Sequence, residues 1–434
     1  MPRRRSRAAQ GFTIVEMVVT LFILVLVIVG VLGLFDLASK VSRVQVDTAD
    51  MQQVVRTAQY DMIRMLRMAG RGKVPRQSPP PAAGPWVWSH PNGVAVGVLD
   101  NVPTGTFVDN PTASNHPVLP GTDVLTIRGV LTSPVYLVDS ATFTVLNTVP
   151  TAVDNGGSFT IRDATPQGGV PQSLDRIAEA IENKRPEALV LVSPDDDSIS
   201  QIVMLDPDNS TVAAGRTSVT VRFRLGRNEY ADAYWQLSGA QWNVALTKLA
   251  YVGIVEEYRY YVADVREKDG VAASAPKPQL RRARLYPGAA KPWGSGPDPD
   301  HPGAPVNDEA NWSVPMADNV ADLQVALGIE TGVGTAFTIT DDGTGGDEWL
   351  FNSAADVPTS PAWRNGRLRY VRINTTGFSE RREQAYTAPG FTGPPVVVED
   401  HSYSVPEFGS PSQNVPDRMY RRRTLKTIVD LRNL

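Results

Sequence analysis

Gly11-Phe12-Thr13-Ile14-Val15-Glu16 opens an apolar run that continues to Phe35, and four arginines precede it within residues 3–7. From Phe12 to Phe35 the only ionisable side chain is that of Glu16. As a helix, this run would be roughly 36 Å long, which is enough to cross the hydrocarbon core of a bilayer. A carboxylate within a membrane span is costly to keep, so Glu16 is a candidate functional residue.

The combination of a basic leader, a Gly–Phe junction, a glutamate four residues later and a long apolar run resembles the N-terminus of type IV prepilins and type II secretion pseudopilins. Gly11, Phe12 and Glu16 occupy the matching positions. The resemblance implies that a membrane prepilin peptidase cleaves between Gly11 and Phe12 and methylates the new amine of Phe12. It also implies that the Glu16 carboxylate faces the Phe12 ammonium of a neighbouring subunit during assembly.

Two ordinary export signals are the alternatives to this interpretation. A secretory signal peptide has a shorter apolar region with a small-residue cleavage site after it, whereas here the small residue precedes a longer run. A plain signal anchor also begins with arginines and about twenty apolar residues. It does not require Gly11-Phe12 or Glu16, and it stays open as an alternative.

The totals limit the function classes. The chain has 434 residues, 42% of them hydrophobic, and no cysteine, so disulfides, thiol catalysis and cysteine-ligated metals are excluded. Removing four leader arginines takes the 42 basic residues to 38, against 46 acidic ones, a balance of −8. Such a balance argues against nucleic acid as the main ligand. The 35 glycines and 35 prolines favour a β-rich domain with long loops.

The first helix is expected to continue beyond the membrane, because no proline occurs between Pro2 and Pro75. Its later part carries a stripe spaced by three and four residues, typical of a buried helix face. The stripe comprises Leu37, Val41, Val44, Thr48, Met51, Val55, Ala58, Met62, Met65 and Ala69. We expect it to pack on the protein's own sheet, with a coiled coil as the alternative.

The predicted organisation is a cleaved leader (1–11), a membrane or filament-core helix (12–35), its amphipathic continuation (36–70) and an exported β-rich domain (71–434). The leader arginines predict a cytoplasmic N-terminus and a periplasmic domain. Strands are predicted at 123–129, 135–138, 142–146, 158–161, 188–192, 200–205, 217–225, 251–265 (one or two), 279–286, 368–373 and 424–430. A short helix capped by Ser173 is predicted over 173–183, residues 320–328 are left as helix or strand, and 287–315 reads as an irregular loop. The fold class is therefore α+β.

Later segments resemble the large PilW-like minor pilins. The strand at 123–129 and the segment 319–331 carry the likeness, although Leu327 stands where a tyrosine is usual and Glu330 where an aspartate is usual. An Asp/Gly-rich turn at 341–347, Trp363, a Val-Arg strand at 370–373 and the closing Arg-Arg run and strand at 421–433 match the same group. The region 130–315 is covered only weakly.

No catalytic, cofactor or metal site is predicted. The four histidines lie far apart in Pro- or Gly-rich connections: His90, His116, His301 and His401. Asp195–Asp197 and Asp341–Asp347 are interpreted as solvated acidic turns, with calcium binding as the alternative. Arg421–Arg423 reads as an exposed basic edge rather than an anion site, and Trp86 and Trp88 as cover for the sheet rather than an adhesive surface.

The sequence thus predicts a pilin-like α+β protein that is a structural subunit and not an enzyme. The resemblance implies a minor type IV pilin, held in the inner membrane and then assembled at a filament tip at the cell surface. Its partners would be prepilin peptidase, other minor pilins and the major pilin. The alternatives are a minor pseudopilin of a type II secretion system, or a signal-anchored periplasmic binding protein or enzyme.

Overall fold

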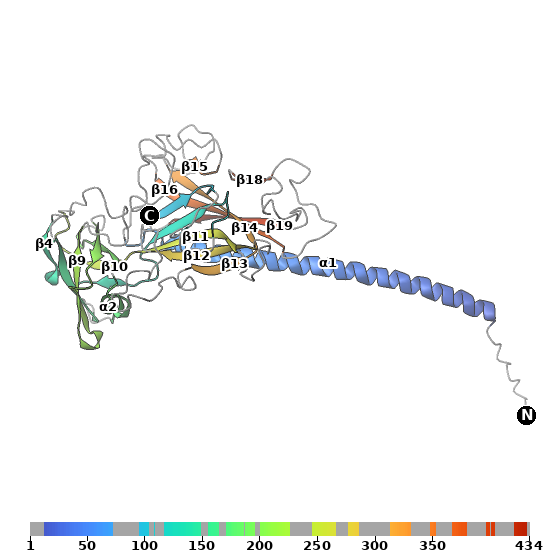
Figure 1. Cartoon of the computed structure of the whole chain (residues 1–434), viewed down its shortest axis with the longest axis horizontal. Helices are drawn as coiled ribbons and strands as arrows, with labels where there is room; N and C mark the ends of the chain where they lie inside the picture. The colour runs from blue at the N-terminus through green and yellow to red at the C-terminus, as the bar shows by residue number, and fades with distance from the viewer. Residues whose placement is uncertain are drawn as a thin grey trace, which may run out of the picture. The chain divides into compact units, whose positions relative to one another are not determined.

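The computed structural model describes residues 13–72, 95–103, 108, 117–148, 155–164, 171–185, 187–195, 200–225, 245–265, 277–285, 313–330, 348–352, 367–379, 396–399, 401–403 and 421–431. These residues form a long N-terminal helix followed by antiparallel sheets (Figure 1). The predicted α+β class is therefore confirmed. The chain divides into two compact units, residues 1–51 and 52–434, and helix α1 contributes to both.

Helix α1 extends over Ile14–Met68, a length of 55 residues. Its proline-free sequence allows this length, because proline in a helix interior removes a hydrogen bond and clashes with the preceding turn. The helix ends where Gly70 and Gly72 take positive φ angles of 73° and 86°. Glycine adopts this backbone conformation without the steric cost that other residues pay. The continuous helix confirms the prediction, and it ends at Met68, two residues before the predicted end.

The predicted apolar stripe is buried from Met51 to Ala69. Val55, Ala58 and Met62 are at most 2% exposed and belong to a core shared with the sheets of that unit. Leu37 and Val41 are 59% and 49% exposed. The expectation that the whole stripe from residue 37 packs on the protein's own sheet is therefore wrong for its first part. The reason is that these residues lie in the first unit, whose described residues form the helix alone.

Two antiparallel sheets flank the last part of α1. One has the order β1 (Val96–Leu99), β2 (Val124–Gly129), β11 (Glu256–Val265), β12 (Lys277–Leu285) and β13 (Ser313–Asp318). The other has the order β15 (Glu348–Leu350), β14 (Val320–Glu330), β16 (Arg367–Phe378) and β19 (Arg422–Asp430). A separate hairpin pairs β17 (Val396–Val398) with β18 (His401–Tyr403). The two larger sheets and the helix share one apolar core.

A third, eight-stranded sheet is inserted between β2 and β11, which are themselves neighbours in the five-stranded sheet. Its order is β3 (Val135–Leu137), β10 (Tyr251–Ile254), β6 (Ala188–Val192), β7 (Ser200–Leu205), β9 (Ser218–Arg224), β5 (Gly156–Arg162) and β4 (Thr144–Asn147), with β8 (Thr211–Val212) beside β9. Helix α2 (Asp175–Glu182) packs into the second core, which belongs to this sheet. Figure 1 shows α2 grouped with β4, β9 and β10. We call residues 130–255 the inserted subdomain.

Strand β6 explains how the inserted subdomain joins the rest of its unit. All five of its residues are buried. Ala188, Val190 and Val192 contribute to the core shared with α1, whereas Leu189 and Leu191 contribute to the core beneath α2. Successive strand residues face opposite sides of a sheet, so a strand buried on both faces reads as a continuous apolar run. The inserted subdomain is thus fixed by a shared core and not by its connections alone.

All the predicted strands are confirmed: 188–192 and 200–205 have the predicted ends, and the others have ends that differ by up to five residues. The run 251–265 is two strands, and its predicted hairpin partner is β12. The segment 320–328, predicted as helix or strand, is part of strand β14. The prediction of an irregular loop over 287–315 is wrong for its last three residues, because residues 313–315 belong to β13. Proline is tolerated there because β13 lies at a sheet edge. Ser173 does not cap α2 as predicted: the helix begins at Asp175, and the Ser173 hydroxyl donates to the Asp175 side chain at 2.9 Å.

Candidate functional site

The first turn of helix α1 holds the one predicted site residue that the structure describes. Glu16 lies three residues after Thr13, which directly precedes the helix. The backbone N–H and the hydroxyl of Thr13 both donate to Glu16 Oε2 at 2.9 Å, and the Glu16 N–H lies 3.3 Å from the Thr13 hydroxyl oxygen. This is the reciprocal arrangement of a capping box, which satisfies donors that the helix leaves free. Gly11 and Phe12 lie outside the described residues.

The Glu16 carboxylate keeps one oxygen available. Oε2 accepts both hydrogen bonds from Thr13, and Oε1 has no hydrogen-bond partner among the residues described here. An ionised carboxylate can accept about four hydrogen bonds. In an apolar medium an unsatisfied charged oxygen costs free energy until a donor reaches it. The site is therefore a half-satisfied anion at the start of an apolar helix, able to accept a cation or another N–H donor.

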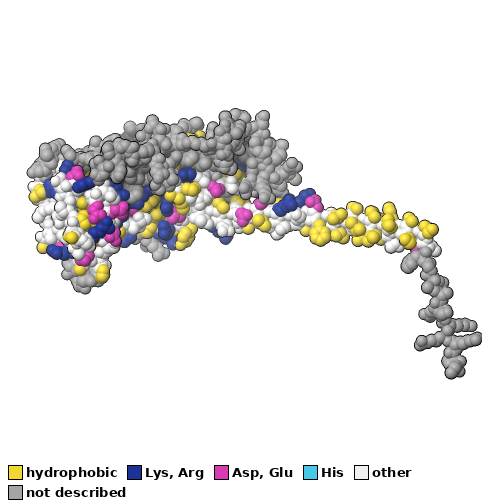
Figure 2. Space-filling view, turned by 60° about the horizontal axis from the view of Figure 1, so that its bottom comes forward, with side chains coloured by type: hydrophobic (Ala, Val, Ile, Leu, Met, Phe, Trp, Pro, Cys, Tyr) yellow, Lys and Arg dark blue, Asp and Glu magenta, His cyan; other side chains and the backbone are white. Residues whose placement is uncertain are grey.

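An apolar surface surrounds this anion. Every large apolar side chain from Ile14 to Phe35 is at least 43% exposed. Figure 2 shows this part of α1 covered by apolar side chains, with charged side chains appearing only where the run ends. The first charged pair after it is Asp36–Lys40, at 2.8 Å between Oδ2 and Nζ. Among the described helices, α1 alone is long and apolar enough to cross a membrane.

Within the second unit, two polar residues fix α1 between the sheets. Gln59 is 1% exposed; its Nε2 donates to the Leu425 carbonyl at 2.6 Å, and its Oε1 accepts from the Thr427 hydroxyl at 2.6 Å. Asp61, two residues later, accepts from the Tyr260 hydroxyl at 2.6 Å and from Arg282 at 2.8 Å. Residues two apart in a helix point about 200° apart. The two side chains therefore bind the opposite sheets that enclose the helix.

Sequence reasoning missed Gln59 and Asp61, although a signal was present. Gln59 follows the apolar stripe position Ala58, and Asp61 precedes the stripe position Met62. In the sequence, a polar residue on a solvent-facing side of a helix looks the same as a polar residue on a second buried side. Desolvation, helped by the neighbouring Asp61 carboxylate, raises the pKa of Tyr260 well above its usual value. The Tyr260 hydroxyl thus stays protonated and donates to Asp61 at neutral pH.

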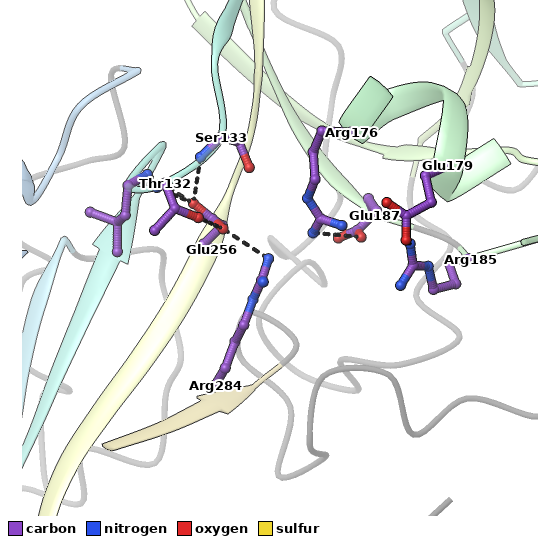
Figure 3. Close-up of polar contacts among 9 residues, drawn as sticks. Thr132, Ser133, Arg176, Glu179, Arg185, Glu187, Glu256 and Arg284 are labelled. Atoms are coloured by element: carbon purple, nitrogen blue, oxygen red, sulfur yellow. Dashed lines mark hydrogen bonds and ion pairs between the residues drawn. The ribbon is translucent and has the colours of Figure 1, made fainter. Parts of the chain in front are cut away.

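A buried carboxylate forms the joint at which the inserted subdomain leaves the five-stranded sheet. Glu256 Oε2 accepts from three successive backbone N–H groups, those of Leu131 (3.1 Å), Thr132 (2.5 Å) and Ser133 (3.1 Å). Its Oε1 accepts from the Thr132 hydroxyl at 2.6 Å and from Arg284 at 2.8 Å. Figure 3 shows these groups converging on Glu256. Successive N–H groups of this kind form an anion-binding concavity, which the protein fills with its own carboxylate.

Other candidates from the sequence do not assemble into a site within the described residues. Asp195 pairs with Lys248 at 3.4 Å, and its neighbours Asp196 and Asp197 lie outside the described residues. Asp341–Asp347, Trp86, Trp88 and three histidines lie there too, and His401 is described only as part of strand β18. No group of three metal-ligating side chains occurs in the described part of the chain. Arg422 and Arg423 open β19. Arg423 is exposed as predicted, whereas Arg421 and Arg422 are half-buried, so the predicted exposed edge is wrong for these two.

The chain matches no protein-family model, no curated protein and no solved structure with which it was compared. We therefore infer its function from its own residues and their geometry.

Proposed function

We propose that this chain is a minor type IV pilin, a structural subunit that primes pilus assembly at the filament tip. The observation that carries the proposal is Glu16: a lone carboxylate with one oxygen open, at the start of a helix that is otherwise apolar to Phe35. Its position four residues after Phe12, behind Gly11 and a basic leader, matches the prepilin pattern.

The chemistry assigned to this site is ionic pairing between subunits. Prepilin peptidase would cleave between Gly11 and Phe12 and methylate the Phe12 amine, which stays cationic as a secondary ammonium. The Phe12 ammonium of an incoming subunit would then donate to Glu16 Oε1 of its neighbour. A buried carboxylate and ammonium are each costly when alone, so their pairing favours one axial register over others.

The size of the second unit supports a place at the tip. It comprises residues 52–434 and carries the inserted subdomain besides the helix-bearing sheets. A repeating shaft requires close lateral packing of many copies, whereas a tip subunit has neighbours on one side only. The partners we assign are the inner membrane before assembly, prepilin peptidase, the other minor pilins and the major pilin.

The test replaces Glu16 with alanine in the native host and follows two steps separately. Leader cleavage is measured by intact mass of the membrane-extracted chain, and incorporation by its amount in sheared filaments. Asp36→Ala is the matched control, because it removes an exposed carboxylate of the same helix beyond the apolar run. We expect Glu16→Ala to be cleaved normally but lost from filaments, and Asp36→Ala to behave as wild type. Normal incorporation of Glu16→Ala would defeat the assigned role.

A further inference from the structure

A single carboxylate links the β17–β18 hairpin to the outer face of the four-stranded sheet. Glu399 accepts hydrogen bonds from Arg372 Nη2 on one oxygen and from Asn374 Nδ2 on the other. Arg372 and Asn374 both lie on β16 and are 8% and 3% exposed. The Arg372 guanidinium also lies 4.1 Å from the centroid of the Trp349 ring. A cation stacked on an aromatic face and held by a buried sheet is a preformed anion site.

The backbone at Glu399 is unfavourable for the residue that stands there. Val398 pairs with His401, and Glu399 follows Val398 in the turn between the two strands. Glu399 has φ of 53°, in the left-handed region that asparagine and glycine fill in such turns. This backbone conformation is strained for a glutamate. Glutamate at this turn position is therefore explained by its side-chain contacts with Arg372 and Asn374 and not by its backbone conformation.

Arg372 is not fully used by this contact. Within the part of the chain that the structure describes, its Nε has no hydrogen-bond partner, although the residue is more than nine-tenths buried. Nε and Nη2 form one edge of the guanidinium, the edge that binds both oxygens of a carboxylate side by side. Glu399 engages only Nη2 and gives its second oxygen to Asn374. A carboxylate approaching without the constraint of this turn can satisfy both nitrogens.

The structure describes the side chains of Val397, Val398 and Glu399 in the hairpin. None of the three belongs to the apolar core of the second unit, and Val397 is 62% exposed. Sixteen residues (380–395) separate the hairpin from Ser379, and seventeen (404–420) separate it from Arg421. The hydrogen bonds of Glu399 with Arg372 and Asn374 are therefore the described side-chain contacts that hold the hairpin on the sheet.

We propose that Arg372, Asn374 and Trp349 form an exchangeable carboxylate-binding site, which Glu399 fills in the isolated chain and a carboxylate of a partner polypeptide fills in its place. Either an acidic side chain or a C-terminal carboxylate supplies the same chemistry. The proposal goes beyond the pilin assignment and does not depend on Glu16.

The test uses the full chain in detergent and a fluorescent peptide copy of residues 394–405 as the probe. A second peptide carries glutamine at the position of Glu399, and a third is an unrelated sequence with a free C-terminal carboxylate, compared with its amide. The chain is used as wild type, as Glu399→Ala, which empties the site, and as Glu330→Ala. Glu330→Ala is the matched control because it removes a different carboxylate from the same sheet, one that is paired with Arg369 at 3.0 Å.

We expect Glu399→Ala to bind the native peptide at least tenfold more tightly than the glutamine peptide, and wild type to bind it more weakly because Glu399 competes. If the third peptide binds tightly as the free acid but not as the amide, the site accepts a C-terminal carboxylate of the partner. If the acid and the amide bind equally weakly, the site accepts an acidic side chain of the partner. Near-ultraviolet circular dichroism checks that Glu399→Ala is folded, and Glu399→Gln is the second variant, since it keeps a side chain that reaches Asn374. Equal binding of the native and glutamine peptides would overturn the proposal. No binding of the native peptide to either Glu399→Ala or Glu399→Gln, or binding to Glu330→Ala as tight as to Glu399→Ala, would also overturn it.

Discussion

Replacing Glu256 with glutamine removes one charge and leaves the side-chain shape unchanged. The carboxylate is 2% exposed and accepts five hydrogen bonds, two of which come from Thr132 and one from Arg284. Glutamine keeps one oxygen for the three backbone N–H groups but turns an NH₂ group toward Arg284. A donor then faces a cation that has lost its buried partner.

The expected cost follows from the burial of the pair. Breaking a buried ion pair by removing one partner costs about 3–5 kcal/mol. Arg284 is 19% exposed and can regain some water, so we expect the lower end, about 3 kcal/mol. Because about 1.4 kcal/mol is tenfold in an equilibrium constant, the N–H groups of residues 131–133 should exchange with solvent about a hundredfold faster.

Hydrogen exchange read by mass spectrometry on the full chain in detergent measures this locally. Glu179→Gln is the matched control, since Glu179 pairs with Arg185 at 2.9 Å but is 51% exposed (Figure 3). An exposed ion pair contributes about 0–1 kcal/mol to stability. In Glu179→Gln, hydrogen exchange near residue 179 and at residues 131–133 should therefore change less than tenfold. If Glu256→Gln exchanges at 131–133 no faster than Glu179→Gln does, the carboxylate does not hold the joint.

Two further predictions concern the helix and its sheets. Gln59→Ala removes the side chain that binds Leu425 and Thr427, and we expect it to lower the stability of this contact region by about 1–3 kcal/mol. Faster hydrogen exchange in β19 would show this loss. Thr57→Ala is the reference variant, because it removes an exposed hydroxyl of the same helix. Tyr260 has a raised pKa, so its neutral form is favoured in the folded chain: stability is fully present below pH 10 and falls above it, by up to about 1.4 kcal/mol per pH unit. Urea unfolding at pH 8 to 11 should show a shallower alkaline loss for Tyr260→Phe than for wild type, and parallel curves would contradict this.

The elements that sequence patterns predicted well are those with one dominant signal. Residues 188–192 are uniformly apolar because β6 is buried on both faces, and the proline-free run to Met68 is one helix. The segment 320–328 stayed ambiguous because ten consecutive residues of β14 are buried, which removes the alternation that marks a half-buried strand. Short β1 and β15 carry too few residues for a period to emerge.

The polar contacts within the second unit could not be predicted from the sequence either, and the reason is not a weak periodicity but the long separation of the partners along the chain. Glu256 pairs with residues more than one hundred positions earlier and with Arg284, and nothing local marks it as buried. Glu399 meets Arg372 only because the β17–β18 hairpin returns to β16. Charged residues at strand ends usually lie at the surface, so the default interpretation fails where the fold encloses them. Glu16, in contrast, is conspicuous in sequence because it is the only ionisable residue between Phe12 and Phe35.

If the chain is processed as a prepilin, as we propose, the intact mass of its N-terminus will show the cleavage. The protein would be extracted from membranes of its native host, with and without the host's prepilin peptidase. We expect a mature chain that begins at N-methylated Phe12 only when the peptidase is present. A chain that keeps Met1, or one cut elsewhere in both strains, would contradict it and leave an ordinary signal anchor.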